Sequence, residues 1–196
     1  MNTRAARIGT LLDFADFSTG LRVAAVLFVT VLTIIAAQVS VPLPFTPVPF
    51  TLQPMVVLLG GAALGSRLGM SAQVLYLALG IAGLPVFAAS PILPQGFARL
   101  LGPTGGYLMS YPLAAFVTGY LAQRGFDRRY STSIVAMFAG LAIVFTFGVT
   151  WLAFGAHVGL SQAVRTGLLP FIPADIIKVL LAATVLPAAW RFLGTR

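Results

Sequence analysis

An apolar segment near the C-terminus reads Pro173-Ala174-Asp175-Ile176-Ile177-Lys178-Val179-Leu180-Leu181. Asp175 and Lys178 are the only acidic residue and the only lysine within the apolar stretches of the chain. Their i, i+3 spacing puts both side chains on one face of a helix, close enough to pair. Because an ionisable group inside a bilayer is costly, the pair marks a candidate functional site. An alternative is an ion pair that merely orients the helix.

The composition predicts an integral membrane protein. The 196 residues are 59% hydrophobic and only 8% charged, whereas soluble domains carry about 25% charged residues. The absence of cysteine excludes disulfides, thiol catalysis and cysteine-based metal sites. The net charge of +8 comes from eleven arginines and one lysine. In a membrane protein such an excess reports topology, and nucleic-acid binding is not expected.

Six apolar segments are predicted to be membrane helices, the shorter ones sheltered by the rest of the protein. They cover residues 21–39, 54–64, 68–81, 103–123, 134–154 and 173–190. We expect residues 1–196 to form one all-α membrane domain, with residues 1–20 as a cytoplasmic or interfacial segment containing a short helix. Residues 86–101 and 155–167 are predicted to be loops.

A proline-rich run joins the first two predicted helices. Pro42, Pro44, Pro47 and Pro49 exclude a helix and favour an extended backbone. The run is also apolar, so it is not expected to be a freely solvated loop. Beyond it, Gly61, Gly65 and Gly69 recur at four-residue spacing, which permits close helix packing, here expected within the protein.

The arginines predict the orientation of the six helices. If both termini are cytoplasmic, two arginines, Arg99 and Arg165, fall in external segments. Nine fall in cytoplasmic segments, and this excess favours six spans with both ends inside. The nine are Arg4, Arg7, Arg22, Arg67, Arg124, Arg128, Arg129, Arg191 and Arg196.

This topology places Asp175 and Lys178 in the external half of the sixth helix. The fourth helix also begins outside, so two helix N-termini approach one external region, which suits an anionic ligand. Arg99 lies just ahead of the fourth helix and adds a positive charge. Its alternative role is an interfacial anchor that reaches toward lipid headgroups.

An enzyme is not expected. No second carboxylate lies near Asp175 in the sequence, and no cluster of histidine and carboxylates has the spacing of a metal site. The chain also lacks the G-x-x-x-x-G-K-[ST] motif of a nucleotide-binding loop. Uphill transport driven by ATP would therefore require another subunit.

Four motifs, in this order, closely resemble the BioY family, the biotin-specific S components of energy-coupling factor (ECF) transporters. They are Val48-Pro49-Phe50-Thr51-Leu52-Gln53, Gly83-Leu84-Pro85-Val86-Phe87-Ala88, Leu101-Gly102-Pro103-Thr104-Gly105-Gly106-Tyr107 and Pro170-Phe171-Ile172-Pro173-Ala174-Asp175-Ile176-Ile177-Lys178. The resemblance runs from the first predicted helix to the sixth.

The resemblance implies a six-helix subunit of the bacterial cytoplasmic membrane that binds biotin tightly from outside. It implies partners, namely a transmembrane coupling protein and a pair of ABC-type ATPases, and no cofactor. The proline-rich external loop would fold over the bound vitamin. Some family members work without the ATPase module, so a solitary ion- or proton-coupled vitamin carrier that titrates Asp175 is an alternative. A membrane scaffold with an inert ion pair is a third hypothesis, and a homo-oligomer is left open.

The resemblance also implies roles for individual residues. Asp175 would accept from a ureido N–H of biotin. Lys178 would donate to the ureido oxygen or to the valerate, and Arg99 would meet the carboxylate. The remaining candidates are Tyr107 and Phe87 as ring contacts or simple packing, Ser90 or Gln95 as a polar contact from a loop longer than the family's usual one, and Phe50 and Gln53 from the first motif.

One departure concerns docking. Many S components carry an Ala-xxx-Ala step early in the first helix, where the coupling protein binds. Here Ala24 is followed four residues on by Phe28, and Ala25 by Val29. The docking surface of this chain is therefore expected to use small residues elsewhere.

Overall fold

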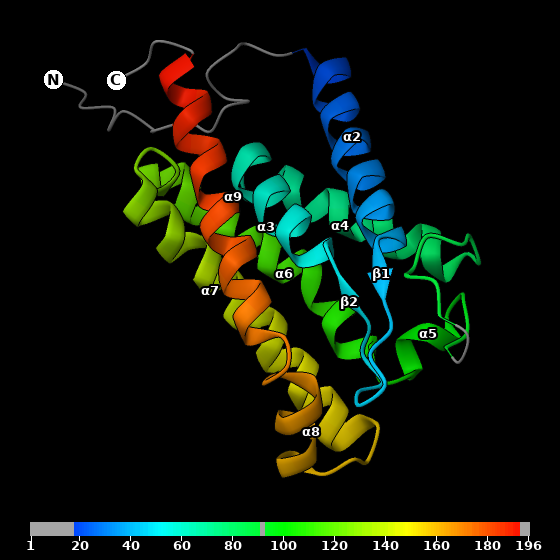
Figure 1. Ribbon diagram of the computed structural model, residues 1–196. Coiled ribbons are helices and arrows are strands. Elements are labelled where there is room, and N and C mark those ends of the chain that lie inside the picture. Colours follow the sequence, from blue (N-terminus) through cyan, green and yellow to red (C-terminus); the bar gives the residue numbers. More distant parts are fainter. Residues whose placement is uncertain (1–17, 91–92, 193–196) are drawn as a thin grey trace, which may run out of the picture.

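The structure, a computed structural model, describes residues 18–90 and 93–192 as a helical bundle with one short hairpin (Figure 1). The helices are α2 (Thr19–Gln38), α3 (Gln53–Leu64), α4 (Ser66–Ile81), α5 (Ala98–Leu101), α6 (Gly105–Leu121), α7 (Tyr130–Thr150), α8 (Leu160–Gly167) and α9 (Ile172–Phe192). Two π-helical turns, η1 (Ala122–Phe126) and η2 (Trp151–Gly155), continue α6 and α7. The all-α prediction is confirmed, one pair of two-residue strands aside. The short helix expected within residues 1–20 lies largely outside the described residues.

Three of the described helices are long and apolar enough to cross a membrane, namely Thr19–Gln38, Tyr130–Gly155 and Ile172–Phe192. The shorter helices α3, α4 and α6 lie among them. Helix α6 occupies the centre, where it packs against α3, α4 and α7, while α9 covers α3 and α7. Helix α2 packs on α3 and α4 and exposes most of its apolar side chains, as a lipid-facing helix does.

The structure corrects several boundaries. Residues 155–167, expected to be a loop, contain α8, whose buried residues Ala163 and Gly167 are spaced four apart. The segment has a helical period, with Leu160, Ala163 and Val164 at i, i+3 and i+4, but its eight residues are shorter than the window of about 11–18 residues in which such a period is recognised. Residues 86–101 likewise contain the single-turn helix α5. The connection between the predicted helices 103–123 and 134–154 shrinks to residues 127–129, because η1 extends to Phe126 and α7 begins at Tyr130.

The proline-rich run forms the loop of a hairpin. Strand β1 (Ser40–Val41) pairs antiparallel with β2 (Phe50–Thr51), with Ser40 opposite Thr51. The prolines between the strands leave few backbone N–H groups to satisfy, which suits an irregular loop. Val48, near the end of the loop, is buried in the main apolar core. The hairpin therefore packs onto the bundle.

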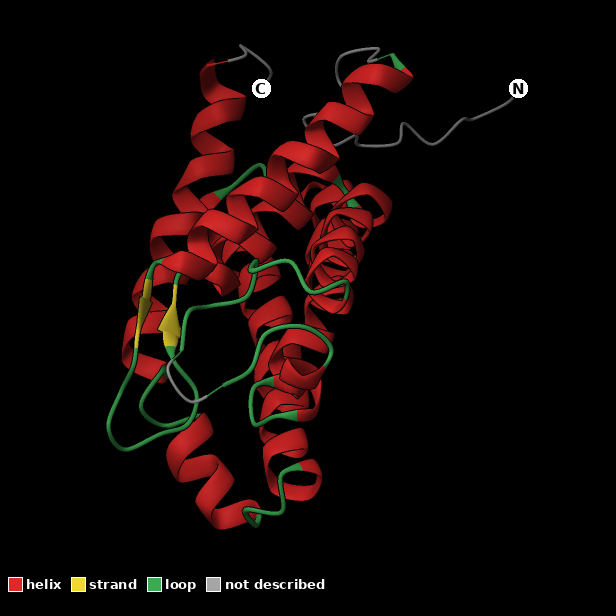
Figure 2. Cartoon of the chain, turned by 90° about the vertical axis from the view of Figure 1, so that its right-hand side faces the viewer, coloured by secondary structure: helices red, strands yellow, loops and turns green. Residues whose placement is uncertain are grey.

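The bundle has two distinct ends. One carries the start of α2, the end of α9 and the η1–α7 connection, and the other carries the hairpin loop, α5 and α8 (Figure 1). The view turned by 90° shows the strands and most of the long loops on the side of the second end (Figure 2). Loops and short elements therefore gather at the second end, and a ligand site can form between them there.

A polar clamp holds α9 at the first end. The buried Asp127 carboxylate, in the connection between η1 and α7, accepts a hydrogen bond from Trp190 Nε1 through Oδ2 at 2.7 Å. The guanidinium of Arg128 lies over the Trp190 ring, with Cζ 3.5 Å from its centroid. Burial raises the pKa of the Asp127 carboxyl, an effect that the bond from Trp190 opposes. The clamp fixes the last turns of α9 against the η1–α7 connection.

Glycines bring α3, α4 and α6 into backbone contact. A Cβ atom on Gly61 would lie 2.4 Å from the carbonyl oxygen of Ala115 in α6. One on Gly69 of α4 would lie 2.6 Å from Gly61 Cα. Gly65 between them has φ 82°, a conformation that glycine adopts without strain, and it turns the chain from α3 into α4. The predicted internal packing of Gly61 and Gly69 is confirmed.

We expect Gly61→Ala to lower the free energy of unfolding by about 1–3 kcal/mol, because the added methyl group must push backbone atoms apart. Thermal unfolding of the purified protein in detergent measures the change. Gly20→Ala is the control, since its Cβ would meet nothing nearer than 3.9 Å. Equal melting temperatures for the two variants would contradict the close approach of α3 and α6.

Candidate ligand-binding site

A pocket opens at the end of the bundle that holds the hairpin loop, between that loop and α6, α7 and α9. Its space, including the open mouth, amounts to about 610 Å³. Its walls are mostly apolar, and a few charged and polar side chains interrupt them. The lining residues are Val48, Pro49, Thr51, Gln53, Pro54, Phe87, Ala88, Arg99, Thr104, Tyr107, Leu108, Tyr111, Val144, Phe145, Phe171, Asp175 and Lys178.

Lys178 joins α9 to the hairpin. Its Nζ donates to Asp175 Oδ1 at 2.7 Å and to the backbone carbonyl of Thr51 at 2.6 Å. The same ammonium lies 3.7 Å from the centroid of the Phe50 ring, a cation–π contact. An ammonium has three donor hydrogens, so these contacts use most of its capacity. Lys178 therefore closes the hairpin onto α9 and has little capacity left for a ligand.

Asp175 keeps a free hydrogen-bonding oxygen. It lies in the first turn of α9, is 4% exposed, and its Oδ1 is taken by Lys178. No described residue donates to Oδ2, and the residue lines the pocket. Burial disfavours the charged carboxylate, and the neighbouring ammonium opposes that effect. Asp175 can thus accept a hydrogen bond from an N–H group in the pocket.

Arg99 is a buried cation with unused donors. It lies in α5, is 1% exposed, and donates through Nη2 to the carbonyl of Ala88. Within the described chain, nothing accepts a hydrogen bond from its Nε or Nη1. Burial lowers the pKa of this guanidinium, which stays protonated in proteins nonetheless. A buried cation with two unpaired donor nitrogens at a pocket wall is a site for an anion. This burial argues against the alternative role as an anchor among lipid headgroups.

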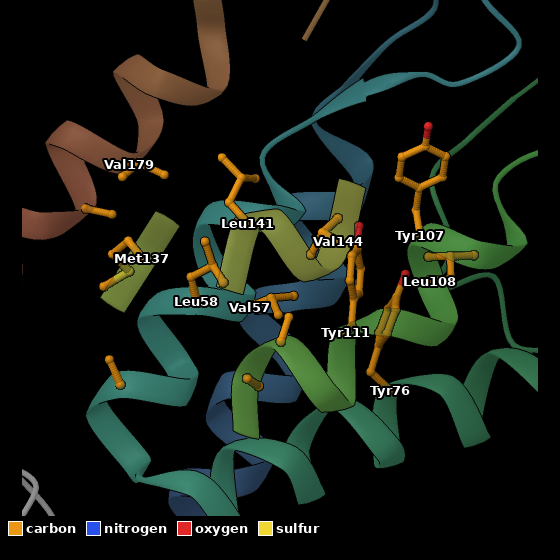
Figure 3. Packing of buried hydrophobic residues seen from close by; sticks show 14 of the residues in the cluster. Val57, Leu58, Tyr76, Tyr107, Leu108, Tyr111, Met137, Leu141, Val144 and Val179 are labelled. Atoms are coloured by element: carbon orange, nitrogen blue, oxygen red, sulfur yellow. The ribbon is translucent and has the colours of Figure 1, made fainter. Parts of the chain in front are cut away.

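Tyr76 is the centre of an aromatic cluster, and its two ring neighbours, Tyr111 and Phe87, line the pocket. Gln53 Nε2 donates to Tyr76 Oη at 2.6 Å, and Tyr76 Oη donates to the carbonyl of Val86 at 3.3 Å. The ring of Tyr76 stacks on Tyr111 with centroids 6.4 Å apart and meets Phe87 edge-on at 5.6 Å. Figure 3 shows Tyr76 and Tyr111 side by side, with Tyr107 on the same side of the core. These contacts fix the rings before any ligand enters.

Tyr107 presents its ring to the pocket because its hydroxyl is already bonded. Tyr107 Oη donates to the carbonyl of Gly167, at the end of α8, at 2.8 Å. A Cβ on Gly167 would lie 2.3 Å from Tyr107 Oη, so only glycine lets the tyrosine hydroxyl come this close to the backbone. The bond attaches α8 to α6 beside the pocket.

The structure brings together most of the predicted site residues. Asp175, Lys178, Arg99, Tyr107, Phe87 and Gln53 all line the pocket. Phe50 contacts the Lys178 ammonium and is not among the lining residues. Ser90 is also absent from the lining, and its hydroxyl accepts from the N–H of Leu93 at 3.3 Å. Gln95, the alternative to Ser90, is exposed.

Several lining residues were missed by sequence reasoning. Thr104 and Phe171 line the pocket and belong to the motifs at residues 101–107 and 170–178, but neither was predicted to contact a ligand. Tyr111 follows Tyr107 by four residues, and this spacing on a helix predicts a shared face. Thr51 contributes its backbone carbonyl to Lys178, and side-chain patterns carry no signal for such a contact.

Fold and pocket together define a membrane protein built of apolar helices that encloses a site for a small ligand. The chain belongs to the BioY family, whose model matches residues 10–195.

Individual relatives agree with this assignment. The chain is 42% identical to a probable biotin transporter BioY of Pyrococcus horikoshii, over 83% of this chain and 90% of that protein. It is 40% identical to the biotin transporter BioY of Thermotoga maritima, over 80% and 88% of the two chains. A crystal structure of the S-component for biotin from an ECF-type ABC transporter superposes with a TM-score of 0.77 at 28% identity, over 89% of this chain and 95% of the other.

We expect Lys178→Met to lower the free energy of unfolding by about 3–5 kcal/mol, because it leaves the buried Asp175 carboxylate without its ion-pair partner. The double variant Asp175→Asn/Lys178→Met removes both charges and should recover part of that loss. Thermal unfolding in detergent compares the two. A double variant no more stable than the single one would show that the pair is not coupled.

Proposed function

We propose that this protein captures biotin from outside the cytoplasmic membrane, as the substrate-binding S component of an ECF transporter. The observation that carries the proposal is a pocket with a hydrogen-bond acceptor, Asp175, and an unsatisfied cation, Arg99, set in aromatic and apolar walls. The names of the relatives and of the superposed crystal structure support the same substrate. The protein acts as a transport subunit and not as an enzyme.

The chemical groups of biotin match the pocket. Biotin has two ureido N–H donors, one ureido carbonyl, an apolar sulfur-containing ring and a valerate carboxylate. Asp175 Oδ2 accepts from a ureido N–H, a charge-assisted hydrogen bond in a water-poor site. Arg99 pairs with the valerate through its spare N–H groups. Tyr107, Tyr111 and Phe87 enclose the apolar ring.

Lys178 takes a mainly structural part in this proposal. Its ammonium already contacts Asp175, Thr51 and Phe50. It fixes the rotamer of Asp175 and holds the hairpin over the pocket, which pre-organises the acceptor for the ureido group. The proline-rich loop is then an external lid that Lys178 keeps closed.

We infer six membrane spans, formed by α2, α3, α4, α6–η1, α7–η2 and α9, with both termini in the cytoplasm. The start of α2, the end of α9 and the η1–α7 connection share one end of the bundle, and the arginines in or beside these segments outnumber those in α5 and α8. The excess of arginine assigns that end to the cytoplasm. The pocket then opens to the outside.

A coupling protein and a pair of ABC-type ATPases supply the energy in this proposal. The chain has no nucleotide-binding loop of its own, and the superposed structure belongs to a component of an ABC transporter. A solitary carrier driven by ions or protons is the competing function. Asp175 would then be its titrating group, as an ionisable residue within a membrane helix.

Asp175→Asn should weaken biotin binding by about 10- to 100-fold, because it replaces a charged hydrogen-bond acceptor. Isothermal titration of the purified protein measures the affinity. Asp127→Asn is a matched control, because Asp127 contacts the opposite end of α9 and the new amide oxygen can still accept from Trp190. Desthiobiotin keeps the ureido and carboxylate groups, so it should show the same loss. Unchanged affinity in Asp175→Asn would exclude the proposed ureido contact.

Uptake distinguishes the two transport mechanisms. We expect cells that contain this protein without a coupling module to accumulate little labelled biotin, and co-expression of the coupling protein and ATPases to restore uptake. Uptake by the protein alone that an uncoupler abolishes would instead favour the solitary carrier.

A further inference from the structure

Thr104 carries a buried hydroxyl without a partner. The residue is 7% exposed and lines the pocket. Its Oγ1 makes no hydrogen bond with any residue in the described ranges. Buried polar atoms in native proteins are nearly always paired, so an orphan at a pocket wall calls for a ligand group to complete it.

Thr104 does not cap α6 with its side chain, although it occupies the N-cap position. It precedes α6 as the N-cap residue, where a threonine side chain usually accepts from a backbone N–H of the first turn. Here the side chain makes no capping hydrogen bond. The hydroxyl hydrogen and the oxygen are therefore both available to the pocket.

The position of Thr104 is rigidly set by its neighbours. A Cβ on Gly105 would lie 1.8 Å from the carbonyl oxygen of Leu100, and one on Gly106 would lie 2.2 Å from Trp151 Cβ. Trp151 Nε1 also donates to the carbonyl of Gly102 at 2.9 Å. The turn before α6 is thus packed tightly against α5 and η2, which fixes the backbone position of Thr104.

The surroundings of Thr104 favour an anion. Arg99, five residues earlier, lines the same pocket with Nε and Nη1 unpaired. The N-terminus of α6, a 17-residue helix, adds partial positive charge at this wall. A carboxylate offers about four lone-pair sites on two oxygens, so it can accept from a guanidinium and a hydroxyl together.

We propose that Thr104 donates a hydrogen bond to the carboxylate of the bound ligand, beside Arg99, and so contributes to selection for the free acid. This inference rests on the proposed function, since biotin supplies the carboxylate. The bond adds a directional contact to the charge of Arg99. It also explains why a hydroxyl is kept unpaired in an apolar wall.

The test compares two ligands against two variants of the full chain. The ligands are biotin and an analogue whose carboxylate is replaced by a methyl group. Thr104→Val keeps the shape and removes the hydroxyl, whereas Thr104→Ser keeps the hydroxyl. We expect Thr104→Val to weaken biotin binding at least about tenfold, with the affinity for the methyl analogue unchanged. Thr104→Ser should bind biotin nearly as the unmodified protein does.

The outcomes separate this inference from the proposed function. Equal losses for biotin and the analogue would assign Thr104 a structural role and overturn the inference, as would equal biotin affinity in the valine and serine variants. If the unmodified protein binds no biotin, the proposed function and the inference fall together. Melting temperatures in detergent show that each variant is folded, and Thr104→Ala replaces the valine variant if that one is not.

Discussion

The ammonium of Lys178 is the contact on which the pocket depends. In one position it pairs with Asp175, caps the carbonyl of Thr51 and lies against the Phe50 ring. Each contact offsets part of the large cost of burying a charge among apolar helices. Without it, the hairpin would lose its attachment to α9 and Asp175 would remain as an unpaired buried carboxylate. Shape and electrostatics of the pocket therefore depend on a single side chain.

Helix α9 is held by polar contacts at both of its ends. Lys178 secures the end at the pocket, and Trp190 secures the other through the buried Asp127. Between them the helix packs on α3 and α7 through apolar side chains. Directional bonds at the ends fix the rotation and register of a helix that apolar packing alone would define less strictly. The orientation of Asp175 toward the pocket is set by this combination.

The sequence predicted the helical architecture and most of the polar groups at the site, because charge is rare in this chain and therefore conspicuous. Asp175, Lys178 and Arg99 stood out for that reason. The partner of Lys178 did not, since a carbonyl 127 residues away leaves no mark in a side-chain pattern. The spare hydroxyl of Thr104 was also invisible, because a threonine before a helix suggests a cap until the geometry shows otherwise. The short helix α8 was missed because its eight residues, although amphipathic, are fewer than the roughly 11–18 over which a helical period is recognised.

The glycine contacts among α3, α4 and α6 limit how this scaffold can diversify. Where backbone meets backbone at Gly61, Gly69 and Gly119, no side chain can be trimmed or enlarged to move one helix relative to another. The three helices act as an incompressible block behind the pocket. A protein with this block can accommodate a differently shaped ligand by changing the side chains that face the pocket, the hairpin, the α5 turn and the first turns of α9, and not by moving these three helices. Evolution or design of new specificity on this scaffold therefore acts through the residues that face the pocket and leaves the spacing of these three helices unchanged.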